Sequence, residues 1–188
     1  MRKKQERKKL VILVGGAKSS TGKTTFIKIL LRTFPKAFAV LKITPNTHYG
    51  EGIVEDPAIL NEPGKDTSSF LQEETLGVFW IRGRRENVPF LTDSLLSKLH
   101  HNIIVEGNIF FNFRIPDIVF FVERENEEIK EGSLLLKSNA DYIVKNTFKI
   151  SRYSFDGKIF TVNLKEALKN KLPISDDIHK ILDSIITR

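Results

Sequence analysis

The sequence of 188 residues predicts an α/β fold of three layers with a mainly parallel sheet, on three observations. Apolar runs of strand length recur along the chain, and most are continuous rather than alternating, as is typical of strands covered on both faces. Stretches with helical periodicity lie between several of these runs, which predicts right-handed strand–helix–strand units. The first unit carries at its turn a loop of glycine, lysine and hydroxyl side chains, a composition suited to phosphate binding.

The expected strands are rich in β-branched and aromatic residues. They lie at residues 10–14, 37–43, 76–81, 102–107, 117–123, 141–146 and 158–164. The expected helices lie at residues 22–34, 88–99, 126–138 and 174–187. The first helix places Ile27, Leu30 and Leu31 on one side, and Pro35 marks its end. Residues 44–70 are rich in Pro, Gly, Asn and Asp, and we expect them to form one long loop that is functional or mobile.

The length predicts one domain over residues 10–188, preceded by a basic arm over residues 1–9. Residues 2–9 read RKKQERKK and carry most of the formal net charge of +7, so the rest of the chain is nearly balanced. Because the positive charge is concentrated in the arm, nucleic acid is not an expected partner. The arm is either solvated or in contact with a phosphate or membrane surface.

The absence of cysteine excludes disulfides, thiolate metal centres and a cysteine nucleophile. The apolar run at 10–17 follows basic residues, but Gly15, Gly16 and Lys18 interrupt the pattern that a secretory leader needs. No apolar run approaches the roughly 20 residues of a membrane-spanning helix. We therefore expect a cytoplasmic protein without a membrane span.

The segment AKSSTGKT at 17–24 fits the relaxed Walker A pattern Ala/Gly-x-x-x-x-Gly-Lys-Ser/Thr, with Ala17 in the first position. Backbone N–H groups of such a loop and of the helix that follows converge on one point and favour a polyphosphate. The pattern therefore predicts a P-loop NTPase fold that binds ATP or GTP with Mg²⁺. The expected nucleotide-binding residues of the loop are Ala17, Lys18, Ser19, Ser20, Thr21, Gly22, Lys23, Thr24 and Thr25.

The loop also predicts individual roles. Gly22 lets the backbone pass close to the phosphates, and Lys23 is the expected catalytic cation between the outer phosphates. The Thr24 hydroxyl is an expected Mg²⁺ ligand. Glu106 ends a buried-type strand, where the second carboxylate of such a metal site is expected, and Asp66 is a further candidate ligand. Glu123, at the end of the next strand, is the alternative to Glu106.

Lys18 occupies the position that marks the signature-lysine NTPases, such as septum-site ATPases and nitrogenase iron protein. The resemblance implies a catalytic lysine that reaches the nucleotide of a partner chain in a homodimer. Ser19 and Ser20 stand where those proteins usually carry glycines. The alternative is an exposed loop lysine that adds local positive charge.

Four segments together resemble the molybdopterin-guanine dinucleotide biosynthesis protein B family of molybdenum-cofactor assembly. They are AKSSTGKTT (17–25), VLKITPNTH (40–48), PGKDT (63–67) and IIVEG (103–107). The resemblance implies GTP binding with weak hydrolysis, and an accessory role beside a nucleotidyl transferase. It also implies a lysine and histidine cluster after the second strand, which falls here on Lys42 and His48.

The strand that ends near Lys42 should run parallel to the strand before the phosphate loop, so the loop after it should open at the same edge of the sheet. Cations and hydroxyls in that loop suit an anionic small molecule or cofactor ligand. The expected ligand-binding residues are Lys42, Thr44, His48, Lys65 and Thr67. Asp66 would act in catalysis by binding a metal-bound water or a substrate hydroxyl.

The expected activity is Mg²⁺-dependent nucleotide binding with slow hydrolysis or phosphoryl transfer. A small-molecule kinase or synthetase of the dethiobiotin-synthetase type is one alternative, and a dimeric switch ATPase acting on a partner protein is another. The choice between ATP and GTP stays open, because the guanine-reading pattern Asn-Lys-x-Asp is absent. Asn146, at the end of a late strand, is the candidate contact to the base.

Overall fold

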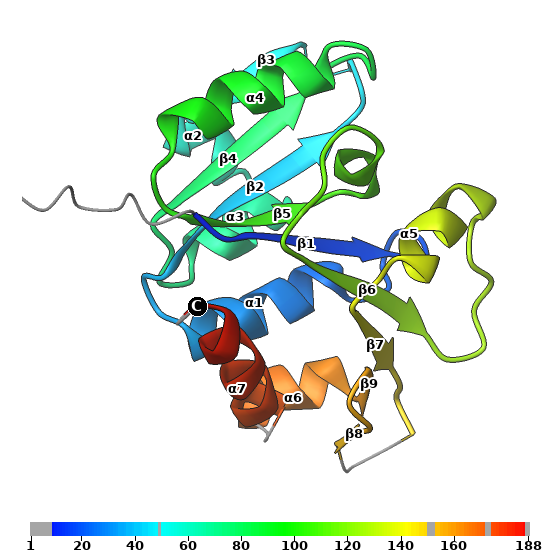
Figure 1. The fold of residues 1–188 in the computed structure, drawn as a ribbon. Helices are drawn as coiled ribbons and strands as arrows, with labels where there is room; N and C mark the ends of the chain where they lie inside the picture. Colours follow the sequence, from blue (N-terminus) through cyan, green and yellow to red (C-terminus); the bar gives the residue numbers. More distant parts are fainter. Residues whose placement is uncertain (1–8, 49, 150–152, 172–173, 187–188) are drawn as a thin grey trace, which may run out of the picture.

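The computed structural model describes residues 9–48, 50–149, 153–171 and 174–186, so all of the expected basic arm except Lys9 lies outside the described residues. The described residues form one nine-stranded sheet with the order β3-β4-β2-β5-β1-β6-β7-β9-β8 (Figure 1). No helix among them is long and apolar enough to cross a membrane.

Every strand expected from the sequence is present near its expected place. These strands are β1 (Val11–Gly16), β2 (Phe38–Thr44), β4 (Gly77–Arg82), β5 (Asn102–Glu106), β6 (Ile118–Arg124), β7 (Tyr142–Asn146) and β9 (Ile159–Val162). They pair in parallel throughout, and β1 and β2 are both parallel to β5 between them. Two short strands, β3 (Gly52–Val54) and β8 (Ser154–Phe155), add antiparallel edges.

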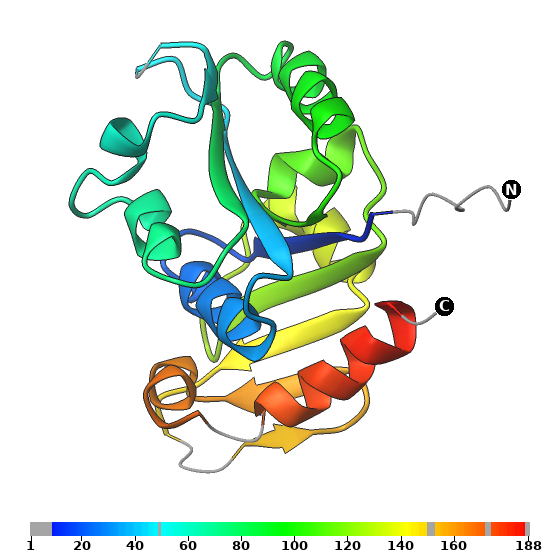
Figure 2. The ribbon, with the colours of Figure 1, turned by 90° about the vertical axis from the view of Figure 1, so that its left-hand side faces the viewer.

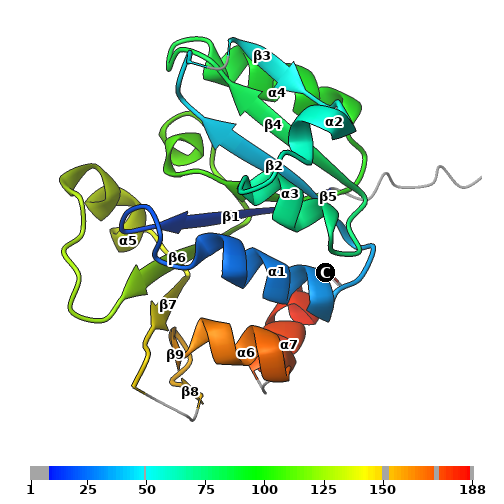
Figure 3. The same ribbon diagram turned by 180° about the vertical axis from the view of Figure 1, so that it is seen from behind.

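Helices cover both faces of the sheet, and this explains why the apolar runs are continuous. One face carries α1 (Lys23–Thr33), α2 (Pro57–Leu60), α3 (Asp66–Leu71), α6 (Leu164–Asn170) and α7 (Ile174–Ile186). Figure 3 shows α1 and α6 in front of the sheet. The other face carries α4 (Val88–Lys98), α5 (Leu134–Ser138) and the 3₁₀ helix η1 (Asn108–Asn112). Figure 2 shows the sheet between α1 and α4, which confirms the three layers.

The helix expected at 126–138 is much shorter in the structure. Asn126 has a positive φ of 61°, which an α-helix does not accommodate, and Lys130 N donates to Ala17 O at 3.3 Å. Only a 3₁₀ turn, η2 (Glu131–Ser133), and α5 form. The segment before them is rich in acidic residues and offers only Ile129 to the core, which is too little apolar surface to stabilise a long helix.

The strand expected at 158–164 ends at Val162, because Asn163 begins helix α6, which we did not predict. The Asn163 side chain accepts a hydrogen bond from Glu166 N at 3.2 Å, which is an N-cap. The spacing of asparagine and glutamate is a capping-box pattern that the sequence displays, but the helix is too short for apolar periodicity to reveal it.

The segment expected as one long loop contains β3, α2 and α3. Asp56 caps α2 by accepting from Ala58 N at 2.9 Å, and Pro57 takes the first helical position. Leu60 and Phe70 are buried in the core beside α1. These anchors hold the start of α3, and with it Asp66, at a defined place against the sheet.

Candidate nucleotide-binding site

The loop between β1 and α1 has the backbone that phosphate binding needs. Gly22 has a φ of 112°, and a Cβ there would lie 2.8 Å from Asn146 Nδ2, so only glycine fits. Ser20 also adopts a positive φ, of 62°. The loop curls around Lys23, whose Nζ donates to Lys18 O at 2.8 Å. The loop therefore presents an ammonium group inside a ring of backbone, at the N-terminus of an eleven-residue helix.

The sheet register brings Lys42 and Glu106 together. Lys42 on β2 is the direct partner of Glu106 on the neighbouring parallel strand β5. Both side chains therefore point to the same face, which is the face covered by α1. Lys42 Nζ lies 3.5 Å from Glu106 Oε2, and Glu106 is only 6% exposed.

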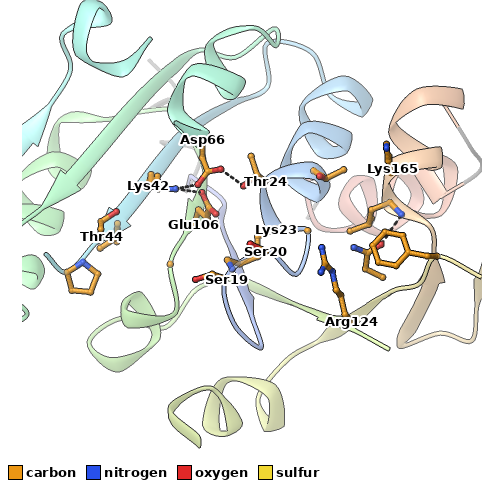
Figure 4. Close-up of a pocket in the computed structure, with 18 residues that line it drawn as sticks. Ser19, Ser20, Lys23, Thr24, Lys42, Thr44, Asp66, Glu106, Arg124 and Lys165 are labelled. Carbon is orange, nitrogen blue, oxygen red and sulfur yellow. Dashed lines mark hydrogen bonds and ion pairs between the residues drawn. The ribbon is translucent and has the colours of Figure 1, made fainter. Parts of the chain in front are cut away.

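Asp66 connects this pair to the phosphate loop (Figure 4). Asp66 Oδ1 accepts a hydrogen bond from Thr24 Oγ1 at 3.0 Å, and Asp66 Oδ2 pairs with Lys42 Nζ. Lys42 thus touches both carboxylates. Four separate elements, α1, β2, α3 and β5, place these groups within one small volume at the carboxyl edge of the sheet.

Burial and neighbouring charge shift the pKa values of the cluster in different directions. Burial raises the pKa of Glu106, although Lys42 and Lys23 oppose the shift. Burial lowers the pKa of Lys23, against the attraction of Glu106, and the neighbouring Lys42 lowers it further. Burial also acts to lower the pKa of Lys42, but Glu106 and Asp66 outweigh it and the net shift is upward. Of these two lysines, Lys23 is therefore the one whose charged form its surroundings disfavour.

A cavity of about 600 Å³ runs along this edge of the sheet, a size typical of small-ligand sites. Its lining comprises Ser19, Ser20, Gly22, Lys23, Thr24, Thr25, Lys42, Ile43, Thr44, Pro45, Asp66, Glu106, Gly107, Arg124, Asn146, Phe148, Leu164 and Lys165. A smaller cavity of about 220 Å³ lies against Lys42, Thr44, Gly64, Lys65, Asp66, Thr67 and Trp80. The two cavities share Lys42, Thr44 and Asp66, so they meet beside the carboxylate cluster.

The architecture resembles that of LpxK from Aquifex aeolicus, solved as the "apo" form in complex with ATP. The TM-score is 0.53 at 15% sequence identity, over 80% of this chain and 52% of that one. The chain has a P-loop NTPase fold. It spans about half the length of LpxK. No known family profile matches the chain, and no curated protein sequence matches it. The likeness shows the fold and does not bear on the molybdenum-cofactor family.

Within the P-loop, the predicted residues divide into three groups. Ser19, Ser20 and the residues from Gly22 to Thr25 line the large cavity. Ala17 and Thr21 are buried beneath it, and Ala17 N donates to Val122 O at 3.0 Å. Lys18 points elsewhere in the same chain, since its Nζ lies 3.4 Å from Glu127 Oε2.

The other predicted residues have varied surroundings. Lys65 and Thr67 line the smaller cavity, where the Thr67 hydroxyl donates to Leu60 O at 2.8 Å and so also holds α2 to α3. His48 is exposed and lines neither cavity.

Asn146 lines the large cavity, but Nδ2 donates to Thr21 O at 2.9 Å and Oδ1 accepts from Leu164 N at 3.2 Å. Glu123, the alternative metal ligand, pairs with Lys137 at 2.7 Å and lies outside the cavity lining.

The residues present suit Mg²⁺ held together with a nucleotide. Thr24, Asp66 and Glu106 would supply a hydroxyl and two carboxylates. In the described part of the chain, no group of three or more His, Cys, Asp or Glu side chains could hold a metal by itself. Phosphate oxygens and water would complete the coordination, as Mg²⁺ prefers.

Sequence reasoning missed the far end of the cavity. Arg124 ends β6, and Phe148 follows β7 by two residues. The rule that located Glu106, that ligands bind at the carboxyl ends of parallel strands, also applies to these two positions. An arginine and a phenylalanine at these positions belong to no acidic or guanine-reading motif, so only their place at the strand ends marks them.

Asp66 is expected to stabilise the fold at neutral pH and to lose this effect in acid. Burial acts to raise the pKa of Asp66, but Lys42 and Thr24 outweigh it, so the folded-state pKa lies below the ordinary value of 3.8. The stabilisation is therefore full above that unfolded-state value and is lost as pH falls through the folded-state value. Because the side chain is 43% exposed, Asp66→Asn should cost no more than about 1 kcal/mol at neutral pH.

Urea denaturation of wild type and Asp66→Asn at several pH values measures this effect. The difference in free energy of unfolding should shrink as pH drops below the ordinary value of 3.8 and should go on shrinking as pH falls through the folded-state pKa of Asp66. Asp93→Asn, which removes a surface carboxylate paired with Arg114, is the matched control. If the difference in free energy of unfolding between wild type and Asp66→Asn grew in acid, the lowered pKa of Asp66 would be contradicted.

Proposed function

We propose that this protein binds a Mg²⁺–nucleoside triphosphate, ATP or GTP, and transfers the terminal phosphoryl group to an anionic small molecule. The observation that carries the proposal is the junction of the two cavities at Asp66 and Lys42. The P-loop would hold the triphosphate in the larger cavity. The smaller cavity would hold the acceptor beside the terminal phosphate.

Positive charge near the smaller cavity supports an anionic acceptor. Lys65 Nζ lies 4.9 Å from the centre of the Trp80 ring, and the Arg82 guanidinium lies 5.1 Å from it. Trp80 Nε1 donates to Thr44 Oγ1 at 3.0 Å, which orients the ring at the cavity wall. Two cations held against one aromatic ring suit a phosphorylated or carboxylated compound.

The cluster could perform the transfer as follows. An acceptor oxygen forms a bond to the terminal phosphorus as the bond from that phosphorus to the bridging oxygen of the nucleoside diphosphate breaks. Lys23 and Lys42 would stabilise negative charge on the transferring group, and bound Mg²⁺ would neutralise charge on the outer phosphates. The lowered pKa of Asp66 makes it a weak base. Asp66 would therefore orient the acceptor hydroxyl and take its proton late.

Nucleotide turnover with and without added metabolites tests the proposal. We expect slow hydrolysis of ATP or GTP alone and strong stimulation by a fraction that contains the acceptor, with a phosphorylated product. Lys23→Ala measured in parallel controls for contaminating kinases. The metabolites tested should include hydroxyl compounds, as substrates of a kinase, and carboxylates, as substrates of a synthetase. If neither class stimulated turnover, phosphoryl transfer to a small molecule would be contradicted.

A second candidate is the accessory role in molybdopterin-guanine dinucleotide assembly. Its support is that the four resembling segments contribute Lys23, Lys42, Asp66 and Glu106, which line the same cavity. This candidate predicts GTP binding with slow hydrolysis that no small acceptor stimulates. Measuring whether the protein increases the yield of a molybdopterin nucleotidyl transferase distinguishes it from the kinase.

If the protein were a dimeric switch ATPase, turnover would depend on Lys18 from a partner chain. Because Lys18 pairs with Glu127 of its own chain, we instead expect Lys18→Ala to keep at least about a third of wild-type turnover. We also expect specific activity to be independent of protein concentration. If an equimolar mixture of Lys18→Ala and Lys23→Ala chains were more active than either variant alone, Lys18 would act across a dimer.

A further inference from the structure

The far end of the large cavity holds a guanidinium and an aromatic ring side by side. Arg124 and Asn146 are register partners on the parallel strands β6 and β7, and Phe148 lies two residues after the end of β7. Arg124 Cζ lies 5.2 Å from the centre of the Phe148 ring. Both residues emerge at the edge of the sheet that carries the P-loop, and both line its cavity.

Contacts among the described residues leave part of each side chain without a partner. Phe148 is 64% exposed, although phenylalanine is usually buried. Arg124 Nη1 lies 3.3 Å from Glu127 Oε1, while Arg124 Nε is buried without a hydrogen-bond partner in the described structure. An open aromatic face and an arginine with an unmet donor inside one cavity indicate a ligand with a flat, polar ring.

Asn146 holds this end of the cavity at a fixed position relative to the P-loop. Its side chain bridges Thr21 O and Leu164 N, so the loop backbone, the end of β7 and the start of α6 form one unit. Gly22 permits this contact, because any Cβ would displace the Asn146 amide. The phosphate cradle and the Arg124–Phe148 pair are therefore pre-organised with respect to each other.

We propose that Arg124 and Phe148 form a stacking platform for the nucleobase of the bound triphosphate, and that the base is read by its face rather than its edge. This inference rests on the proposed nucleotide binding. Lys23 lies between Arg124 and the Asp66–Lys42–Glu106 cluster (Figure 4), so a triphosphate on the P-loop would direct its base to the platform and its terminal phosphate to the cluster.

The polar groups around the platform give little means of distinguishing adenine from guanine. Asn146 is engaged with backbone on both sides of its amide, and the neighbouring Leu164 is apolar. Lys165 adds only a flexible cation. Stacking tolerates either purine because both have a π face. We therefore expect ATP and GTP to bind with Kd values within about tenfold of each other.

Calorimetric titration with three Mg²⁺ complexes tests the platform: ATP, GTP and inorganic tripolyphosphate, which has the phosphates but no base. Phe148→Ala should weaken both nucleotides by about tenfold and tripolyphosphate by less than about twofold. Phe148→Tyr should restore nucleotide affinity. Phe90→Ala removes another exposed ring from α4, on the other face of the sheet, and should change none of the three affinities.

Three results would overturn the inference, each in a recognisable way. Unchanged nucleotide affinity in Phe148→Ala, or equal weakening of tripolyphosphate, removes the platform but leaves nucleotide binding intact. A preference of more than about 100-fold for one purine in the wild type shows that the edge of the base is read instead. If wild type binds none of the three complexes, both the proposed function and the platform are contradicted.

Discussion

Lys23→Ala is expected to weaken the binding of ATP and GTP about 100-fold and to leave the fold intact. The Lys23 ammonium lies inside the P-loop, with its Nζ 2.8 Å from Lys18 O. A bound polyphosphate would gain several charge-assisted contacts to this ammonium, each stronger than a neutral hydrogen bond. Loss of those contacts falls directly on nucleotide affinity.

The stability of the fold should not depend on Lys23. Burial lowers the pKa of Lys23, which means that the folded protein holds the charged ammonium less favourably than water does. Alanine at this position removes that cost, so we expect the melting temperature without nucleotide to stay within a few degrees of wild type. The wild type and not the variant should then show a rise in melting temperature when nucleotide is added.

Calorimetric titration of both nucleotides measures the affinity. Lys28→Ala, which removes a lysine from the same helix where it pairs with Glu73 at 3.3 Å, is the matched control and should bind nucleotide normally. Equal affinity of wild type and Lys23→Ala for ATP and for GTP would show that the loop at 17–24 does not bind their phosphates.

Asp66→Asn is expected to reduce turnover by about 1,000-fold while the nucleotide Kd changes by less than about threefold. Asp66 accepts from Thr24 Oγ1 and pairs with Lys42, at the junction of the two cavities. Asparagine has the same shape and can still accept from Thr24, but it provides no charge for Lys42 and no base for a hydroxyl. The loss therefore falls on the reacting end of the nucleotide rather than on its binding.

Steady-state kinetics with the acceptor, together with titration of nucleotide alone, separate the two effects. Asp56→Asn retains a side-chain oxygen that can cap α2 in the same segment and should leave both quantities unchanged. Wild-type turnover in Asp66→Asn would remove the 44–70 segment from the chemistry. A parallel loss of nucleotide affinity would instead assign Asp66 mainly to Mg²⁺.

Patterns local in the chain determined a large part of this protein. The strand from Val11 and the helix from Lys23 enclose the P-loop pattern, and each is stabilised by contacts that short-range periodicity reveals. Continuous apolar runs indicated strands buried on both faces. The structure confirms a mainly parallel sheet between two layers of helices. The sequence was sufficient to predict these strands, the first helix and the P-loop, because each of them depends on residues that are close together in the chain.

Only the tertiary structure decided which distant residues meet. The pairing of Lys42 with Glu106 depends on β5 lying between β1 and β2, and no local pattern encodes that strand order. The same order brings Arg124 and Phe148 to one edge, and it lets the amide of Asn146, the predicted base contact, bridge the P-loop and α6. Strand order follows from how the crossovers bury apolar surface over the whole sheet, a long-range property that a single sequence does not display.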